Sequence, residues 1–215
     1  MINPSQLYQL LEESAARHTH LCPRQVLGVR IGLLGAQTLG LDLPRKDKRL
    51  LVILETDGCF ADGVEVATGC TVGHRTLRVE DYGKVAATFV DTHTEGAVRI
   101  FPRLDVRQRA AQTLPHEERR YFAQLYAYQM MPDDELLAIQ TVHLKNPVKQ
   151  IVSRPSARLH CAHCGEEIIN EREVHCNGLC LCRACGGQAY YQVVEPELTM
   201  LPAMQTLGEK GTLSF

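Results

Sequence analysis

The spacing of apolar and polar residues predicts a helical beginning for the chain. Apolar positions recur at helical spacing over residues 4–15 and again, more densely, over residues 23–40. Each segment opens with a proline, Pro4 or Pro23, which favours the first turn of a helix because an amide there has no intrahelical partner. Three glycines make one side of the second helix thin, as close packing on a sheet or another helix requires: Gly28, Gly32 and Gly35.

The middle of the chain mixes strands and helices irregularly. Short apolar runs bounded by turn residues predict strands at residues 50–55, 76–79, 84–91, 96–101 and 136–144. Helices are predicted over residues 61–68 and from Pro115 to about Met130. A hairpin around Thr94-Glu95-Gly96 argues against a doubly wound α/β fold. The pattern therefore predicts an α+β fold with a mixed or antiparallel sheet flanked by helices.

Near the C-terminus, two C-x-x-C pairs are separated by seventeen residues. Pairs at this spacing can bring four thiolates onto one tetrahedral Zn²⁺, which prefers sulfur ligands. The predicted ligands are Cys161, Cys164, Cys182 and Cys185. The segment is too small to hold a core of its own, so a structural zinc ion has to supply its folding energy.

These signals divide the chain into three predicted parts. Residues 1–150 form the α+β core domain, residues 151–195 a small zinc-ribbon or zinc-finger domain, and residues 196–215 a C-terminal tail. The turn residues of Ser153-Arg154-Pro155-Ser156 predict a linker between the first two.

Two further cysteines, Cys176 and Cys180, lie in a hairpin whose turn is predicted at Asn177-Gly178. They are interpreted as small buried apolar residues, with the alternative that Cys180 competes for the metal because it points the same way as Cys182. Three nearby histidines are expected to be solvated neighbours: His160, His163 and His175.

Composition narrows the classes of function. The 215 residues carry a formal net charge of −2, and residues 151–195 hold four basic and five acidic side chains, so binding to nucleic acid is not expected. Nine cysteines without a recognisable signal sequence favour metal or thiol chemistry in the cytoplasm over disulfides. The longest apolar stretch is too short to span a membrane.

A second group of metal-binding and nucleophilic residues occurs in the first half of the chain. All five lie in predicted loops or at predicted ends of elements, where a scaffold holds functional side chains: His18, His20, Cys22, Cys59 and Cys70. The position of Cys22 at the start of a helix stabilises its thiolate, which favours nucleophilic attack and metal binding.

The order of these motifs resembles the FmdE family, which takes its name from a subunit of molybdenum or tungsten formylmethanofuran dehydrogenase. The resemblance covers about residues 5–145 and rests on four stretches: His18-x-His20-x-Cys22-Pro23, Glu55-Thr56-Asp57-Gly58-Cys59-x-x-Asp62, Thr68-Gly69-Cys70-Thr71-x-Gly73 and Asp81-Tyr82-Gly83-Lys84-x-Ala86. It implies an α+β core that pairs as a homodimer, with the His and Cys cluster in a cleft near the dimer interface. Some members also carry a C-terminal zinc finger.

One departure from the family pattern is Arg24, which stands where the family usually has glycine after Cys-Pro. A guanidinium there favours a thiolate at Cys22 or recruits an anion, and it narrows the cleft against a bulky substrate. The chain has neither a Gly-x-Gly-x-x-Gly fingerprint nor a P-loop.

Three functions remain open at this point. The first is a metal- or thiol-handling accessory protein that serves a molybdenum or tungsten oxidoreductase, with a transition metal bound in the core. The second is an enzyme that uses Cys22 as nucleophile and His20 as acid and base. The third is a non-catalytic adaptor that docks a partner through its zinc finger.

Overall fold

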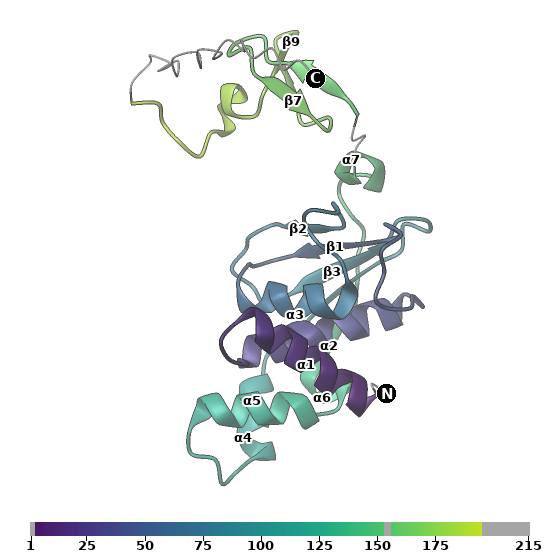
Figure 1. The fold of residues 1–215 in the computed structure, drawn as a ribbon, viewed down its shortest axis with the longest axis vertical. Coiled ribbons are helices and arrows are strands. Elements are labelled where there is room, and N and C mark those ends of the chain that lie inside the picture. The colour runs from purple at the N-terminus through teal and green to yellow at the C-terminus, as the bar shows by residue number, and fades with distance from the viewer. Residues whose placement is uncertain (1–2, 153–155, 195–215) are drawn as a thin grey trace, which may run out of the picture. The chain divides into compact units, whose positions relative to one another are not determined.

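A computed structural model describes residues 3–152 and 156–194, and the chain divides into two compact units, Met1–Ser153 and Arg154–Phe215. The first unit is an α+β domain in which helices flank a five-stranded sheet (Figure 1). This confirms the predicted fold class. None of the helices in the described ranges combines the length and the apolarity that crossing a bilayer requires.

The sheet of the first unit has the strand order β2-β1-β3-β4-β5. Only β1 and β2 run parallel, and the other neighbours are antiparallel. The strands are β1 (Leu50–Leu54), β2 (Leu77–Val79), β3 (Ala87–Asp91), β4 (Ala97–Pro102) and β5 (Leu137–Thr141). The helices are α1 (Pro4–Arg17), α2 (Pro23–Thr38), α3 (Cys59–Thr68), α4 (Val106–Thr113), α5 (Arg120–Met130), α6 (Asp133–Leu136) and α7 (Val148–Val152).

Both faces of the sheet are apolar, and different helices cover them. Val52 of β1 and Phe89 of β3 belong to the main core with α2 and α3 (Figure 1). Leu51 and Val90, which alternate with them along the same strands, form a second cluster with Val148 of α7. Residues 148–152, which adjoin the predicted linker, are thus a short helix that covers the second face.

The glycines of α2 allow unusually close packing, as predicted. A Cβ atom on Gly28 would lie 2.4 Å from the carbonyl oxygen of Phe60, and one on Gly63 of α3 would lie 2.4 Å from that of Gln25. A Cβ on Gly35 would lie 2.3 Å from the ring of Phe89. The backbones of α2 and α3 are therefore in direct contact, which fixes the two helices relative to each other.

Two helix predictions need correction. The helix predicted from Pro115 begins at Arg120, because residues 115–119 form turns in which Glu117 accepts the amide of Arg119 at 3.0 Å. Helix α4 was not predicted, since Val106 and Ala110 are its only two buried side chains and leave little apolar periodicity. The predicted linker residues 153–155 lie outside the described residues.

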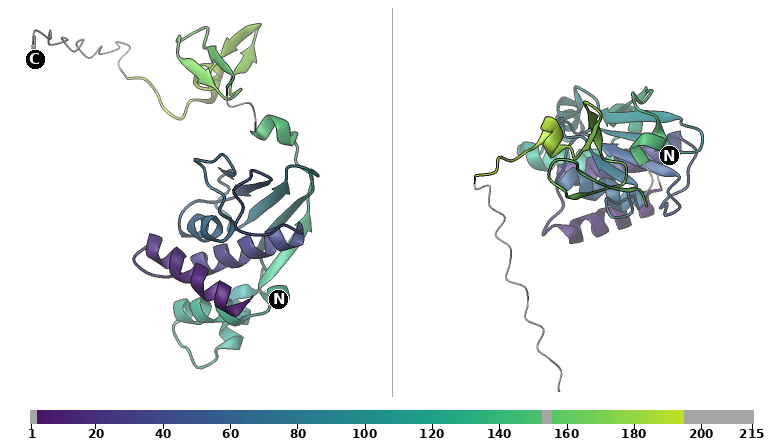
Figure 2. Two further views of the ribbon diagram at one scale, coloured as in Figure 1. Left: turned by 45° about the vertical axis from the view of Figure 1, so that its right-hand side comes forward. Right: turned by 90° about the horizontal axis from the view of Figure 1, so that it is seen from above.

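The second unit, called the finger below, consists of two small hairpins and a helical turn (Figure 2). Its elements are β6 (Arg158–His160), β7 (Glu167–Ile169), β8 (Val174–Cys176), β9 (Leu179–Leu181) and η1 (Ala184–Gln188). The β8–β9 turn is at Asn177-Gly178, as predicted, and both residues have positive φ, 51° and 80°. The predicted tail, residues 196–215, lies outside the described residues.

Candidate metal and thiol sites

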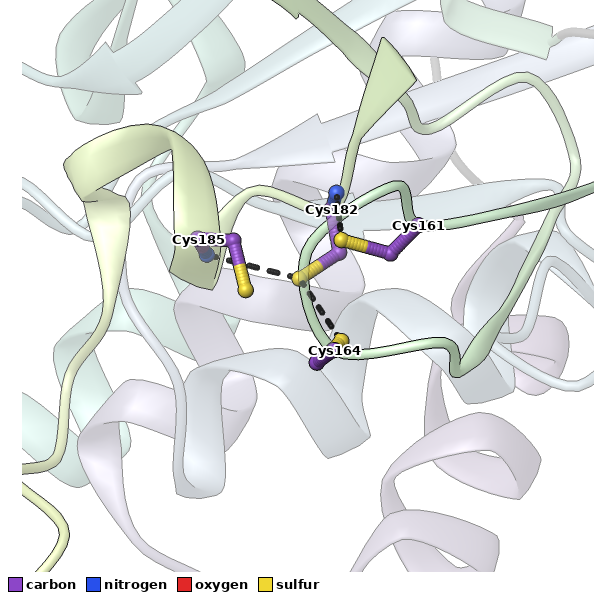
Figure 3. A group of neighbouring side chains, drawn as sticks. All are labelled: Cys161, Cys164, Cys182 and Cys185. Carbon is purple, nitrogen blue, oxygen red and sulfur yellow. Dashed lines mark hydrogen bonds between the residues drawn. The ribbon is translucent and has the colours of Figure 1, made fainter. Parts of the chain in front are cut away.

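The four cysteines of the two C-x-x-C pairs come together in the finger. Their sulfur atoms all lie within 4.8 Å of one another, and those of Cys164 and Cys182 are 4.0 Å apart. A tetrahedral zinc ion with Zn–S bonds of about 2.3 Å separates its sulfur ligands by about 3.8 Å. Figure 3 shows the four side chains converging from a loop, the end of β9 and η1. The donor set fits zinc.

Each pair lies in a tight turn that presents its sulfurs. The amide of Gly165 donates to the carbonyl of Cys161 at 2.9 Å, and the amide of Gly186 donates to that of Cys182 at 2.9 Å. A Cβ on Gly186 would lie 2.4 Å from a methyl of Val174, so the second turn also packs against β8. Backbone amides point at the sulfurs as well: that of Cys182 lies 3.3 Å from Sγ of Cys161.

Electrostatics of the metal-free finger also favour a cation. Amides of Cys164 and Cys182 lower the pKa of Cys161 to about 6. The neighbouring Cys182 thiol, with burial, raises the pKa of Cys185 to about 12. One thiolate therefore forms readily while the next resists ionisation, because the four sulfurs are crowded. A divalent metal removes this conflict by neutralising the charge of the remaining thiolates.

The other predicted candidates of the finger lie around this group. Cys176 and Cys180 are half-buried and do not belong to it. His175 pairs with Cys180 across the hairpin, and His160 is exposed. Nδ1 of His163 lies 3.5 Å from Sγ of Cys185, near enough for a hydrogen bond to that sulfur.

In the first unit, a second thiol site forms where α1 ends and α2 and α3 begin. Nε2 of His18 lies 3.3 Å from Sγ of Cys59, and its Nδ1 lies 2.9 Å from Oδ2 of Asp62. The Asp62 contact has poor hydrogen-bond geometry and is an ion-pair approach. A second ion pair, from Arg17 to Glu65 at 2.8 Å, ties the end of α1 to α3 and so positions His18.

Cys22 completes this arrangement, and His18, Cys22, Cys59 and Asp62 are called the core thiol site below. Cys22 caps α2, and its amide donates to Oε1 of the buried Gln25 at 2.8 Å. Gln25 in turn donates to the carbonyl of Ser14 at 2.7 Å, which ties α2 to α1. Burial, followed by a hydrogen bond with the Cys22 thiol, raises the pKa of Cys59. The two thiols are therefore in contact.

Two further side chains face the core thiol site. The positive charge of Arg24 acts to lower the pKa of Cys59, against the larger effect of burial. The hydroxyl of Tyr121, on α5, donates to the carbonyl of Leu21 at 3.3 Å. Burial raises the pKa of Tyr121, with smaller contributions from charge on Cys22 and Cys59, so the phenol lies near both sulfurs.

The remaining two core candidates lie apart from these contacts. His20 is exposed, and its Nδ1 lies 3.2 Å from the hydroxyl of its neighbour Thr19. Cys70 is fully buried in the main core, with its thiol 3.5 Å from the carbonyl of Leu50. Across the described ranges, the finger thiols are the one group of three or more donors that all lie within 4.8 Å. The contacts of the core thiol site are pairwise, with Cys59 at the centre.

Asp62 and Tyr121 were not predicted as site residues. Asp62 follows Cys59 by three positions at the start of a helix, a spacing that places both on one face, and this signal was available in the sequence. Tyr121 comes from a helix almost 100 residues away, and no local pattern indicates its position.

Comparison with known proteins gives three results. A family model described as "FmdE, Molybdenum formylmethanofuran dehydrogenase operon" matches residues 17–146. A protein of Archaeoglobus fulgidus, named "Probable S-adenosyl-L-methionine-binding protein", is 38% identical over 103 residues, which are 46% of this chain and only 28% of that protein. A crystal structure of an FmdE-like protein of tungsten formylmethanofuran dehydrogenase type, from Syntrophus aciditrophicus, superimposes with a TM-score of 0.55 at 22% identity, covering 86% of this chain and 95% of that one.

Proposed function

Because the chain belongs to the FmdE family, we propose that it is a metal- and thiol-handling accessory protein of a molybdenum or tungsten oxidoreductase system. In this proposal the finger holds a structural zinc ion, and the core thiol site binds a second transition metal. The family description and the name of the structural relative support the oxidoreductase connection.

The observation that carries the core metal site is the orientation of His18. Histidines that bind metals usually have their other ring nitrogen held by a carboxylate, and Asp62 lies 2.9 Å from Nδ1 of His18. This leaves Nε2 directed at Cys59, which also contacts Cys22. Two thiols and an imidazole are the donors that soft or borderline metals such as Zn²⁺ and Cu⁺ prefer.

Titration of the metal-free full-length chain with Co²⁺ tests the proposal, since cobalt bound to thiolates absorbs strongly in the near ultraviolet. We expect two equivalents in the wild type and one in Cys59→Ala. Cys70→Ala is the matched control, because that thiol is buried in the main core, and it should keep both equivalents. One equivalent in the wild type, unchanged by Cys59→Ala, would show that the core binds no metal.

The homodimer, the cytoplasmic location and the partner oxidoreductase belong to the same proposal. Exposed apolar side chains on α5, Tyr126 and Met130, support a protein contact on that helix. Analytical ultracentrifugation of the full chain tests the dimer, and transfer of metal from the loaded chain to a metal-depleted oxidoreductase tests the accessory role. A monomer contradicts the first, and a lack of transfer contradicts the second.

A further inference from the structure

The contact between Cys22 and Cys59 follows from the packing of their helices. Cys22 precedes the first residue of α2, and Cys59 is the first residue of α3. Further along these helices, the backbones touch at Gly28 and Gly63, where no Cβ atom would fit. The two helix starts, and with them the two sulfurs, are therefore held side by side by rigid elements.

The two thiols differ in exposure and in their neighbours. Cys22 is 8% exposed, whereas Cys59 is only half-buried and has Nε2 of His18 at 3.3 Å. An imidazole in that position can accept the thiol proton, and the carboxylate of Asp62 stabilises the imidazolium that results. Both sulfurs also lie at helix N-termini, where the helix dipole favours a thiolate.

We propose that Cys59 and Cys22 form a redox-active dithiol that reduces small disulfides. Cys59 is the attacking thiol because it is the more exposed and has the base. Cys22 is the resolving thiol because it is buried behind Cys59 and in contact with it. The activity uses residues of the metal site proposed above, but it requires no metal.

The reaction proceeds in two balanced steps. The Cys59 proton passes to Nε2 of His18, and the thiolate attacks one sulfur of the disulfide R–S–S–R; the S–S bond breaks, and the first R–S⁻ leaves and takes up a proton. The Cys22 thiolate then attacks Sγ of Cys59, and the second R–S⁻ leaves in the same way. Two electrons pass from the protein to the substrate, so that one disulfide becomes two thiols while a Cys22–Cys59 disulfide forms.

The test incubates the reduced full-length chain, with its zinc bound, with glutathione disulfide, followed by alkylation and peptide mass mapping of all nine cysteines. The wild type should release two glutathione molecules per chain and form the Cys22–Cys59 disulfide. Cys22→Ser should stop after the first step, with glutathione attached to Cys59 and one molecule released. Cys59→Ser should release none from this site, and Cys70→Ala should behave as the wild type.

The role of His18 is tested by the rate of the first step in the Cys22→Ser background. His18→Gln should slow attachment of glutathione to Cys59 by about 100-fold, in the range that a general base contributes. Modification of Cys22 rather than Cys59, or a wild type that stops at the mixed disulfide, would overturn the proposal. A rate in His18→Gln equal to that of its parent would overturn the role of His18.

Cobalt titration of the same samples separates this activity from metal binding. If the core takes up no cobalt but the Cys22–Cys59 disulfide forms, the metal site fails and the dithiol stands. If cobalt binds and glutathione disulfide leaves Cys22 and Cys59 reduced in the metal-free core, the dithiol fails and the metal site stands.

Discussion

In the finger, the four thiols come from 25 consecutive residues, whereas the two thiols of the core site are 37 positions apart and belong to different helices. The finger sulfurs are held by local turns and have little core beneath them, so their geometry depends on a metal. The core sulfurs are held by the contact of α2 and α3, which exists without any ligand. Sulfur chemistry in the same chain thus rests on metal in one place and on packing in the other.

The largest effect that tests this contrast is expected from Cys182→Ser. Loss of one thiolate should abolish tight metal binding by the finger and with it a folding free energy on the order of 10 kcal/mol. The first unit should unfold at an unchanged temperature. Metal analysis and differential scanning calorimetry measure the two effects. Cys176→Ser, which lies outside the four-thiol group, is the control and should keep its metal.

For the core, the corresponding change is Gly63→Ala, which alters packing rather than a ligand. The added methyl would meet the carbonyl of Gln25, so the first unit should lose about 3 kcal/mol of stability, and the thiols should separate. Urea unfolding measures the stability. Gly73→Ala is the control, because a Cβ there meets nothing within 4 Å. Equal stability of the two variants would disprove the packing argument.

The pH dependence of metal binding sharpens the comparison further. The pKa of Cys164 and that of Cys185 are both raised in the metal-free finger, so both thiols are protonated at pH 7 and must lose protons when metal binds. Affinity should therefore rise with pH, about tenfold per unit for each displaced proton, or about 100-fold for the two. Competition with a chelator at pH 6.5 and 7.5 measures this dependence, and a pH-independent affinity would contradict it.

A smaller effect is expected from Asp62→Asn. An amide in place of the carboxylate orients His18 less firmly, so the core should bind cobalt about 10- to 100-fold more weakly, while the finger keeps its affinity. Separate absorption titrations of the two equivalents measure both constants. A parallel loss in the finger would point to general unfolding instead.

The smallest effect is expected from His20→Ala. This side chain is exposed and bonded to its neighbour Thr19, so neither metal equivalent should change by more than about twofold. The same titration measures it. A loss of the second equivalent would place His20 in the core site and return it to the role that the sequence first suggested.

The local features of this chain were predictable from the sequence, because their causes are local. Asn3 accepts the amide of Ser5 at 3.0 Å and starts α1 as expected, and Gly69 ends α3 in a left-handed conformation. The predicted family and fold class are confirmed. The close approach of the four finger thiols likewise follows from spacing alone, since short turns hold both pairs.

The core thiol site was less predictable, because its contacts depend on tertiary packing. The sequence placed His18 and His20 equally near Cys22, but only packing decides that His18 turns toward Cys59, 41 positions away. Cys70 has the same loop context as Cys59, yet its thiol lies inside the main core. Periodicity cannot distinguish these cases, since it gives the face of an element and not its partner.

The apolar second face of the sheet matters for any shortened form of this protein. Helix α7 covers Leu51 and Val90, and its last residues, Ile151 and Val152, pack against the same cluster. A chain cut after residue 150 would lose half of that cover and expose a flat apolar surface beside β1. Such surfaces promote self-association. A cut after Val152 keeps the cover, so solubility of the shortened protein should depend on these two residues.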